Sequence, residues 1–136
     1  MNTSGWQESS KVFFDLRAAQ IKELNLSDLC YVSGREPRLW SDERLYGDMI
    51  DSILLQSRAT KESSLLEVGC ASGFLAWGLA PRVGKYLGLD VAARAINIAK
   101  KLHLAGAQFR VADGTRLQIA DNSFDSAICS SISAIA

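Results

Sequence analysis

Three carboxylates and two glycines occupy positions at which the strands of a parallel sheet would end. The run LLEVGCASGF places Glu67 at the end of an apolar segment, and Gly69 and Gly73 follow it. Asp90 ends a second apolar segment about 20 positions after Gly69, and Asp113 ends a third. Glycines in such a turn let the backbone approach a ligand closely, and the following helix begins with unsatisfied amide donors. The pattern predicts a ligand-binding turn surrounded by acids.

The acids indicate what this ligand carries. A carboxylate repels a pyrophosphate, whereas it attracts an ammonium or sulfonium group and accepts hydrogen bonds from ribose hydroxyls. Asp90 is placed to accept from both ribose hydroxyls, and Asp113 from the exocyclic amine of a purine. A dinucleotide-binding turn has the spacing G-x-G-x-x-G, whereas this turn has G-x-A-x-G. Simpler interpretations remain open: Glu67 as a solvated strand-end acid, and Asp113 with Gly114 as a common turn.

The elements that would position these residues alternate along the second half of the chain. Short apolar runs predict strands over residues 65–68, 86–89, 108–112 and 124–130. Helical segments are expected between them, over residues 73–80 and 92–104, with Trp77 in the core. Strands spaced by helices imply parallel βαβ units, because only a long crossover returns the chain to start another parallel strand. The fold class predicted is α/β, with a Rossmann-like parallel sheet and flanking helices.

The first part of the chain has a different pattern. Apolar residues at helical spacing predict a helix over residues 7–26, and Gly34 and Pro37 indicate an irregular stretch over residues 27–42. A second helix is expected after Ser41 or Asp42 as its cap. We therefore divide the chain into an N-terminal helical segment (residues 1–60) and a ligand-binding half-domain (residues 61–136) within one compact unit.

Composition excludes several classes of protein. Hydrophobic residues make up 48% of the 136 residues, which excludes a wholly disordered chain. Basic and acidic residues number 15 each, so no overall field draws the chain toward nucleic acid or an anionic membrane. We expect no membrane segment, no secretory signal and a cytoplasmic location. The cysteines, Cys30, Cys70 and Cys129, lie in apolar segments without CxxC spacing, which is typical of buried reduced thiols.

Four motifs together resemble one enzyme family. Residues 65–73 resemble motif I of the class I S-adenosylmethionine-dependent methyltransferases, written (D/E)-x-G-x-G-x-G. YLGLDV (86–91) is similar to the second-strand motif that ends in the ribose-binding acid, and FRVADG (109–114) to the third-strand motif whose Asp contacts the adenine amine. DNSFD (121–125) is similar to the turn that opens the fourth strand in small-molecule methyltransferases. The motifs occur in the family's order over residues 64–130.

This resemblance implies that the chain binds S-adenosylmethionine and transfers its methyl group to a small-molecule nucleophile. The residues that it assigns to the cofactor are Glu67, Gly69, Cys70, Ala71, Gly73, Asp90, Val91, Asp113, Gly114 and Ser130. No catalytic base and no metal site can be named. The fourth strand runs into CSSIS, without the Asn-Pro-Pro-aromatic motif of enzymes that methylate adenine or glutamine amino groups. No basic patch is present either, so we expect no nucleic-acid partner.

Two departures from the family qualify this expectation. Ala71 replaces the middle glycine of motif I, and alanine retains most backbone geometries except positive φ, so cofactor affinity is expected to fall. The family also has three more strands after the fourth, whereas this sequence ends at Ala136. The fourth strand would then present an unpaired edge. We expect that edge to pair with another copy, giving a homo-oligomer, or with a missing C-terminal half.

Three other functions stay open on the sequence alone. The chain could bind S-adenosylmethionine as a catalytically incomplete fragment or partner subunit that acts through oligomerisation. It could be a nicotinamide-binding domain, which the position of Glu67 and the glycine spacing disfavour. It could also be an interaction module whose functional surface is the edge strand.

Overall fold

A computed structural model describes residues 11–12, 15–17, 25–32, 35, 38, 41–112 and 123–129. Four parallel strands form one sheet in the order β3-β2-β1-β4. The strands are β1 (Ser64–Val68), β2 (Lys85–Asp90), β3 (Ala107–Val111) and β4 (Ser126–Cys129). This arrangement confirms the predicted α/β class and the parallel sheet with flanking helices.

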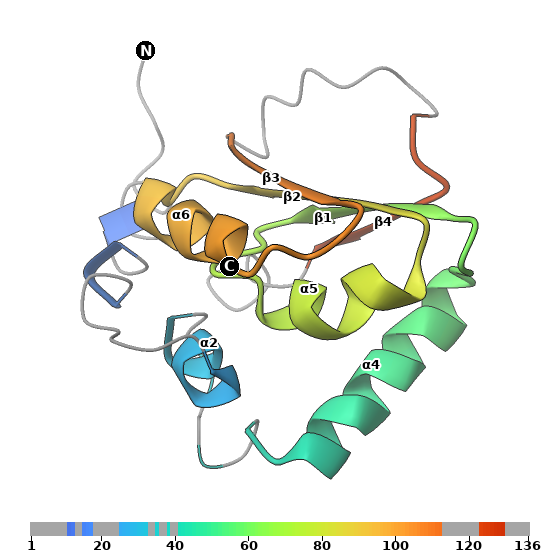
Figure 1. Cartoon of the computed structure of the whole chain (residues 1–136), viewed down its shortest axis with the longest axis horizontal. Coiled ribbons are helices and arrows are strands. Elements are labelled where there is room, and N and C mark those ends of the chain that lie inside the picture. Colours follow the sequence, from blue (N-terminus) through green and yellow to red (C-terminus); the bar gives the residue numbers. More distant parts are fainter. Residues whose placement is uncertain are drawn as a thin grey trace.

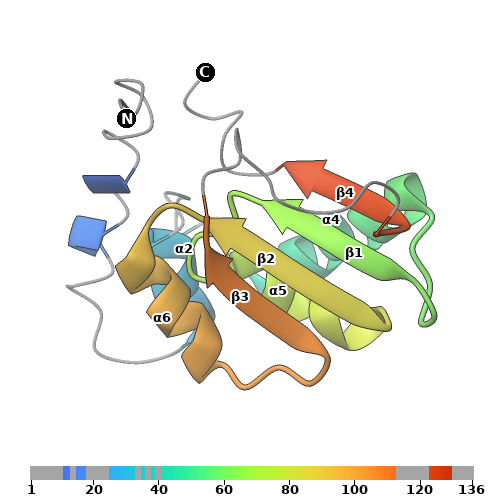
Figure 2. The ribbon, with the colours of Figure 1, turned by 90° about the horizontal axis from the view of Figure 1, so that it is seen from above.

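The helices named in Figure 1 cover one face of this sheet, and Figure 2 shows the strands in front of them. They are α2 (Leu26–Val32), α4 (Glu43–Ser57), α5 (Phe74–Leu79) and α6 (Ala93–Lys101), and a short 3-10 helix, η1 (Ala80–Arg82), follows α5. α5 and η1 connect β1 to β2, and α6 connects β2 to β3. The parallel pairing is in register from Ser64 opposite Lys85 to Val68 opposite Leu89.

The helix α4 begins where the sequence predicts its cap. A side-chain oxygen of Asp42 accepts hydrogen bonds from the backbone amides of Arg44 (3.0 Å) and Leu45 (3.1 Å). These amides have no partner inside the helix, which is why an acid is favourable at this position. The helix ends at Arg58, which adopts a left-handed conformation with φ 58°. One face of α4 is buried through Tyr46, Ile50 and Leu54.

Alternation along the strands sorts their side chains into two clusters. Leu65, Tyr86 and Phe109 face the helices and belong to the main core with residues of α2, α4, α5 and α6. On the opposite face, Leu66, Val68, Leu87 and Leu89 form a second cluster of buried residues. Glu67 and Tyr86 therefore lie on the helix-covered face, because side chains two residues apart on a strand share a face.

Three expectations from the sequence are wrong. The stretch predicted to be irregular contains α2, whose seven residues contribute Leu29 and Cys30 to the core. The apolar residues of α2 span too few positions to show a helical period, and Gly34 and Pro37, which follow the helix, favour an irregular stretch. Trp77 is not in the core: it is 38% exposed on α5, whereas its neighbour Ala76 is buried and Gly78 packs against α4. Cys129 is exposed on β4, whereas Cys30 and Cys70 are buried free thiols.

Candidate functional site

The turn between β1 and α5 requires an unusual backbone. Gly69 (φ 82°) and Gly73 (φ 94°) both have positive φ, which glycine adopts at little cost. Ala71 also has positive φ, at 49°, and its side chain is fully buried. Gly73 has a further constraint, because a Cβ atom there would lie 2.9 Å from Cδ1 of Leu102. The two predicted glycines are therefore needed, and Ala71 takes the one conformation that alanine disfavours.

Backbone amides of this turn donate within the protein. Those of Gly69 and Cys70 donate to the carbonyl of Leu89 at 2.7 and 3.0 Å. The amide of Ala71 donates to Oδ2 of Asp90 at 2.8 Å, and that of Gly73 to the carbonyl of Cys70 at 3.0 Å. A phosphate-binding turn directs such amides at its ligand. Here four of them have protein acceptors, so the turn is shaped for close approach rather than for binding an anion.

Asp90 connects this turn to the next helix. Its Oδ2 accepts from Ala71, and its Oδ1 accepts from the amide of Ala92 at 2.9 Å, just before α6 begins. Burial raises the pKa of this carboxyl, and the backbone donors, Ala92 first, oppose that rise. Each carboxylate oxygen has two acceptor sites, so Asp90 retains acceptor capacity for ribose hydroxyls. Asp90, which the sequence predicts to bind ribose, therefore also fixes the backbone of the turn.

Glu67 lies below the turn rather than at the surface. It is 1% exposed, and Oε1 accepts a hydrogen bond from the hydroxyl of Tyr86 on the neighbouring strand. Burial, followed by the nearby Glu67 charge, raises the pKa of Tyr86 well above its usual range. Gly88 is paired with Glu67 on the β2 side, where it places no side chain beside the carboxylate, and Ile128 is paired with Glu67 on the β4 side. The interpretation of Glu67 as a solvated strand-end acid is wrong.

The sequence reasoning missed Tyr86 as a partner of Glu67. A signal was present, because parallel pairing places both residues on one face and leaves Gly88 between Tyr86 and Asp90. The remaining predicted residues divide into two groups. Cys70 is buried and Val91 is half-buried next to Asp90. Asp113, Gly114 and Ser130 lie outside the residues that the structure describes.

Residues of the first 60 positions also contact the turn and the start of α5. The hydroxyl of Ser72 donates to the carbonyl of Leu29 in α2 at 3.3 Å. The hydroxyl of Tyr46 in α4 donates to the carbonyl of Phe74, the first residue of α5. The guanidinium of Arg35 lies 5.1 Å from the centre of the Phe74 ring. The N-terminal helices therefore hold the exit of the turn.

Two further contacts tie residues 15–17 to the same end of the sheet. Oδ1 of Asp15 accepts from the backbone amide of Arg94 at 3.0 Å, in the first turn of α6. That helix has no side-chain cap of its own, because its cap residue is Ala92. The Arg17 guanidinium donates to the carbonyl of Tyr31 at 2.8 Å and lies 4.5 Å from the centre of its ring. Residues 15–17 thus contact both α6 and α2.

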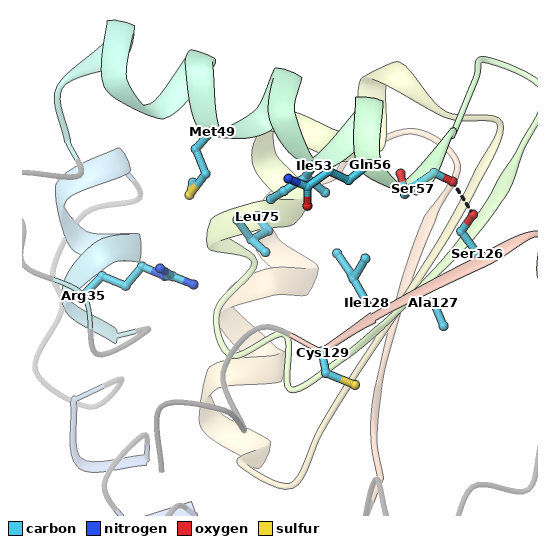
Figure 3. A pocket seen from close by; sticks show the side chains of 10 residues that line it. All are labelled: Arg35, Met49, Ile53, Gln56, Ser57, Leu75, Ser126, Ala127, Ile128 and Cys129. Carbon is cyan, nitrogen blue, oxygen red and sulfur yellow. Dashed lines mark hydrogen bonds between the residues drawn. The ribbon is translucent and has the colours of Figure 1, made fainter. Parts of the chain in front are cut away.

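A cavity of about 610 Å³ lies between α4 and β4. Figure 3 shows Met49 and Ile53 reaching down from α4 and Ile128 pointing up from β4. The hydroxyl of Ser126 donates to the carbonyl of Ser57 at 2.8 Å, which joins the start of β4 to the end of α4. Within the described residues, β4 pairs with β1 alone. We call this cavity the β4 groove.

Among the residues that the structure describes, no helix is both long enough and apolar enough to span a bilayer. Among the same residues, no three His, Cys, Asp or Glu side chains are grouped as metal ligands would be.

Comparison with known proteins gives one family and many similar structures. Residues 65–136 match the family model described as a methyltransferase domain. No curated protein matches the sequence significantly. A phosphoethanolamine N-methyltransferase from Haemonchus contortus, solved with phosphoethanolamine and S-adenosylhomocysteine, is similar over 95% of this chain and 26% of its own, with 17% identity and a TM-score of 0.68.

Two other structures are similar over a larger share of their own length. A putative methyltransferase from Haloferax volcanii, in complex with the Trm112 methyltransferase activator, has a TM-score of 0.62 and 21% identity over 85% of this chain and 46% of its own. A SAM-dependent methyltransferase from Aquifex aeolicus has a TM-score of 0.57 and 21% identity over 79% of this chain and 57% of its own. At these identities the likeness shows the fold, and this chain spans between a quarter and three fifths of the three structures.

Proposed function

Because the chain belongs to the methyltransferase domain family, we propose that it binds S-adenosylmethionine and serves methyl transfer to a small-molecule nucleophile. The observation that carries this proposal is the pairing of an internally bonded glycine turn with two buried carboxylates. Four amides of the turn donate to protein acceptors, and Glu67 and Asp90 add negative charge beneath and beside it. This environment disfavours a phosphate and favours a ligand that carries hydroxyls and a positive charge.

The residues present fit that cofactor. Asp90 has acceptor capacity left for ribose hydroxyls, and Gly69 and Gly73 keep side chains away from the turn. Glu67 contributes its charge from below, and we assign the adenine amine to Asp113 from the family motif. When bound, the cofactor supplies a methyl group activated by its sulfonium. The protein's part is to align an acceptor with that methyl group and to exclude water.

A second polypeptide segment completes the molecule in this proposal. The apolar side chains of Met49, Ile53 and Ile128 line the β4 groove, and no described strand pairs with the outer edge of β4. We propose that a further strand pairs there, from a second copy of this chain or from additional polypeptide. The complex of the Haloferax volcanii methyltransferase with its activator supports a partner of some kind.

The alternative is a subunit that binds the cofactor without completing transfer. It uses the same turn and carboxylates, with no site assigned to a methyl acceptor among the described residues. Methyl transfer by the purified chain alone would exclude this alternative. The free thiols of Cys30 and Cys70 and the ordinary composition support a cytoplasmic setting.

Calorimetric titration tests the proposal directly. We expect the purified chain to bind S-adenosylhomocysteine and not to bind NAD at the same concentration. Asp90→Ala should weaken binding about tenfold or more, because a charge-assisted hydrogen bond to ribose is lost. Asp51→Ala, on an exposed part of α4, is the matched control and should bind as the wild type does. Binding of NAD in preference would refute the proposal.

A further inference from the structure

The hydroxyl of Tyr46 is one of the contacts that join the N-terminal helices to the end of the turn between β1 and α5. Tyr46 is buried in α4, and its hydroxyl donates to the carbonyl of Phe74, directly after Gly73. The Tyr46 and Phe74 rings also meet edge to face, with centroids 5.1 Å apart at 69°. A single side chain thus fixes both the backbone and the ring of the first residue of α5.

The sequence of α5 is adapted to this contact. A Cβ atom at Gly78 would lie 2.6 Å from Cγ1 of Ile50 and 3.0 Å from Cε1 of Tyr46. Only glycine therefore lets α4 approach α5 closely enough for the hydroxyl to reach the helix backbone. The close approach of α4 at Gly78 thus brings the Tyr46 ring against α5, and its hydroxyl donates to the carbonyl of Phe74 one helical turn earlier.

Two other contacts fix the same short segment. The hydroxyl of Ser72 donates to the carbonyl of Leu29, and Arg35 lies over the Phe74 ring. On the other side of the turn, Asp90 and Leu89 of β2 hold its amides. The turn is therefore held between the sheet and the N-terminal helices, and its last residues are fixed by the helices.

We propose that Tyr46 is a positioning residue for the cofactor, which acts by fixing the exit of the turn without touching the ligand. This role of Tyr46 rests on the proposed function. A turn held in its binding geometry loses less conformational freedom when the ligand arrives, so the constraint appears as affinity. In this proposal α4 helps to position the cofactor turn, although it lies in the N-terminal segment of the chain.

Tyr46→Phe tests this, because it removes the hydroxyl and keeps the ring that packs on Phe74. We expect the affinity for S-adenosylhomocysteine, measured by calorimetry, to fall about fivefold to tenfold. Leu54→Val is the matched control: it removes one buried methylene from the same helix, about two turns from Tyr46. It should lower the thermal midpoint by a similar amount and leave the affinity within twofold of the wild type.

The outcomes are distinct. Tyr46→Phe binding within twofold of the wild type would overturn the inference, as would an equal loss of affinity in Leu54→Val. If Tyr46→Phe fails to fold, Ser72→Ala offers the same measurement at the second contact, with the same expected loss. A wild-type chain that binds no S-adenosylhomocysteine would refute the proposed function itself.

Discussion

Ala71 shows how one methyl group sets the properties of the turn. At φ 49° its left-handed conformation costs about 1–2 kcal/mol, whereas glycine there would be free of that cost. Burial of its methyl contributes about 0.8 kcal/mol in the opposite direction. We therefore expect Ala71→Gly to leave the free energy of unfolding within about 1 kcal/mol of the wild type. Ala71→Val should lower it by about 2 kcal/mol or more, because a β-branched residue rarely adopts positive φ.

Urea unfolding of the two variants measures this difference. Equal stability of Ala71→Val and Ala71→Gly would mean that the turn does not hold the left-handed conformation at this position.

The hydrogen bond between Tyr86 and Glu67 predicts non-additive mutations. Tyr86→Phe leaves a buried carboxylate without that donor and should lower the free energy of unfolding by about 1–3 kcal/mol. Adding Glu67→Gln should cost less in the Tyr86→Phe background than in the wild type, because the charge no longer has this partner. A double-mutant cycle by urea unfolding gives the coupling energy. Strict additivity of the two changes would contradict the contact.

The raised pKa of Asp90 predicts opposite pH effects on folding and on binding. Its contribution to stability is fully present below the ordinary value of 3.8 and is lost as pH rises through the raised folded pKa. The stability difference between the wild type and Asp90→Asn should therefore shrink as pH rises above 4. Binding of S-adenosylhomocysteine should weaken as pH falls through the same pKa, because the ionised carboxylate is the better acceptor.

Urea unfolding and calorimetry over the same pH series check both trends. Asp90→Asn should remove the Asp90 part of each dependence. A stability difference that grows with pH would show that the folded pKa lies below 3.8.

At the scale of elements, glycines in two adjacent helices have opposite expected effects. Gly78→Ala would place Cβ 2.6 Å from Cγ1 of Ile50 and should lower the free energy of unfolding by about 1–3 kcal/mol as α4 and α5 separate. Gly47→Ala, on α4, would place a Cβ atom with no contact within 4 Å beyond the adjoining backbone of its own helix, and it should raise the free energy of unfolding by about 0.5–1 kcal/mol. Thermal unfolding of both variants measures these two changes in stability. A stabilised Gly78→Ala would contradict the close packing.

Helices and strands were predicted correctly from the sequence where the hydrophobic period and the length of a segment indicated the same type of element. Strands expected over residues 65–68 and 86–89 are observed as β1 and β2 with one residue added at one or both ends, because apolar runs of that length suit buried parallel strands. The cap Asp42 was found because a side-chain oxygen there satisfies amides that the helix cannot. The helix α2 was missed because it is short and depends on core packing of Leu29 and Cys30.

The sequence predicted which residues lie at the site better than it predicted the contacts that these residues make. Spacing placed Glu67 and Asp90 at neighbouring strand ends, which the register of β1 and β2 confirms. Their protein partners, Tyr86 and Ala71, depend on side-chain directions across strands that a single sequence does not give. The contact of Tyr46 with Phe74 joins residues 28 positions apart, and no local pattern indicates it.

At the scale of the whole molecule, β4 is the outer strand at which we would detect assembly with a second copy. β1 and β2 each pair on both sides, whereas β4 pairs with β1 alone among the described strands. If a second copy pairs along the β4 groove, amide hydrogen exchange in β4 should slow as protein concentration rises, while exchange in β2 stays constant. Sedimentation velocity gives the matching mass. Concentration-independent exchange in β4 with a monomeric mass would exclude pairing between copies.

The three thiols differ in burial, so one of them can be labelled selectively at the β4 edge of the sheet. Burial raises the pKa of Cys30 to about 11, and it raises the pKa of Cys70 well above its usual range. Both stay protonated and enclosed in the folded chain, whereas Cys129 is exposed on β4 beside the groove. A maleimide dye added to the native protein should therefore attach at one place without any cysteine being removed. Its fluorescence would report docking at the sheet's rim in real time.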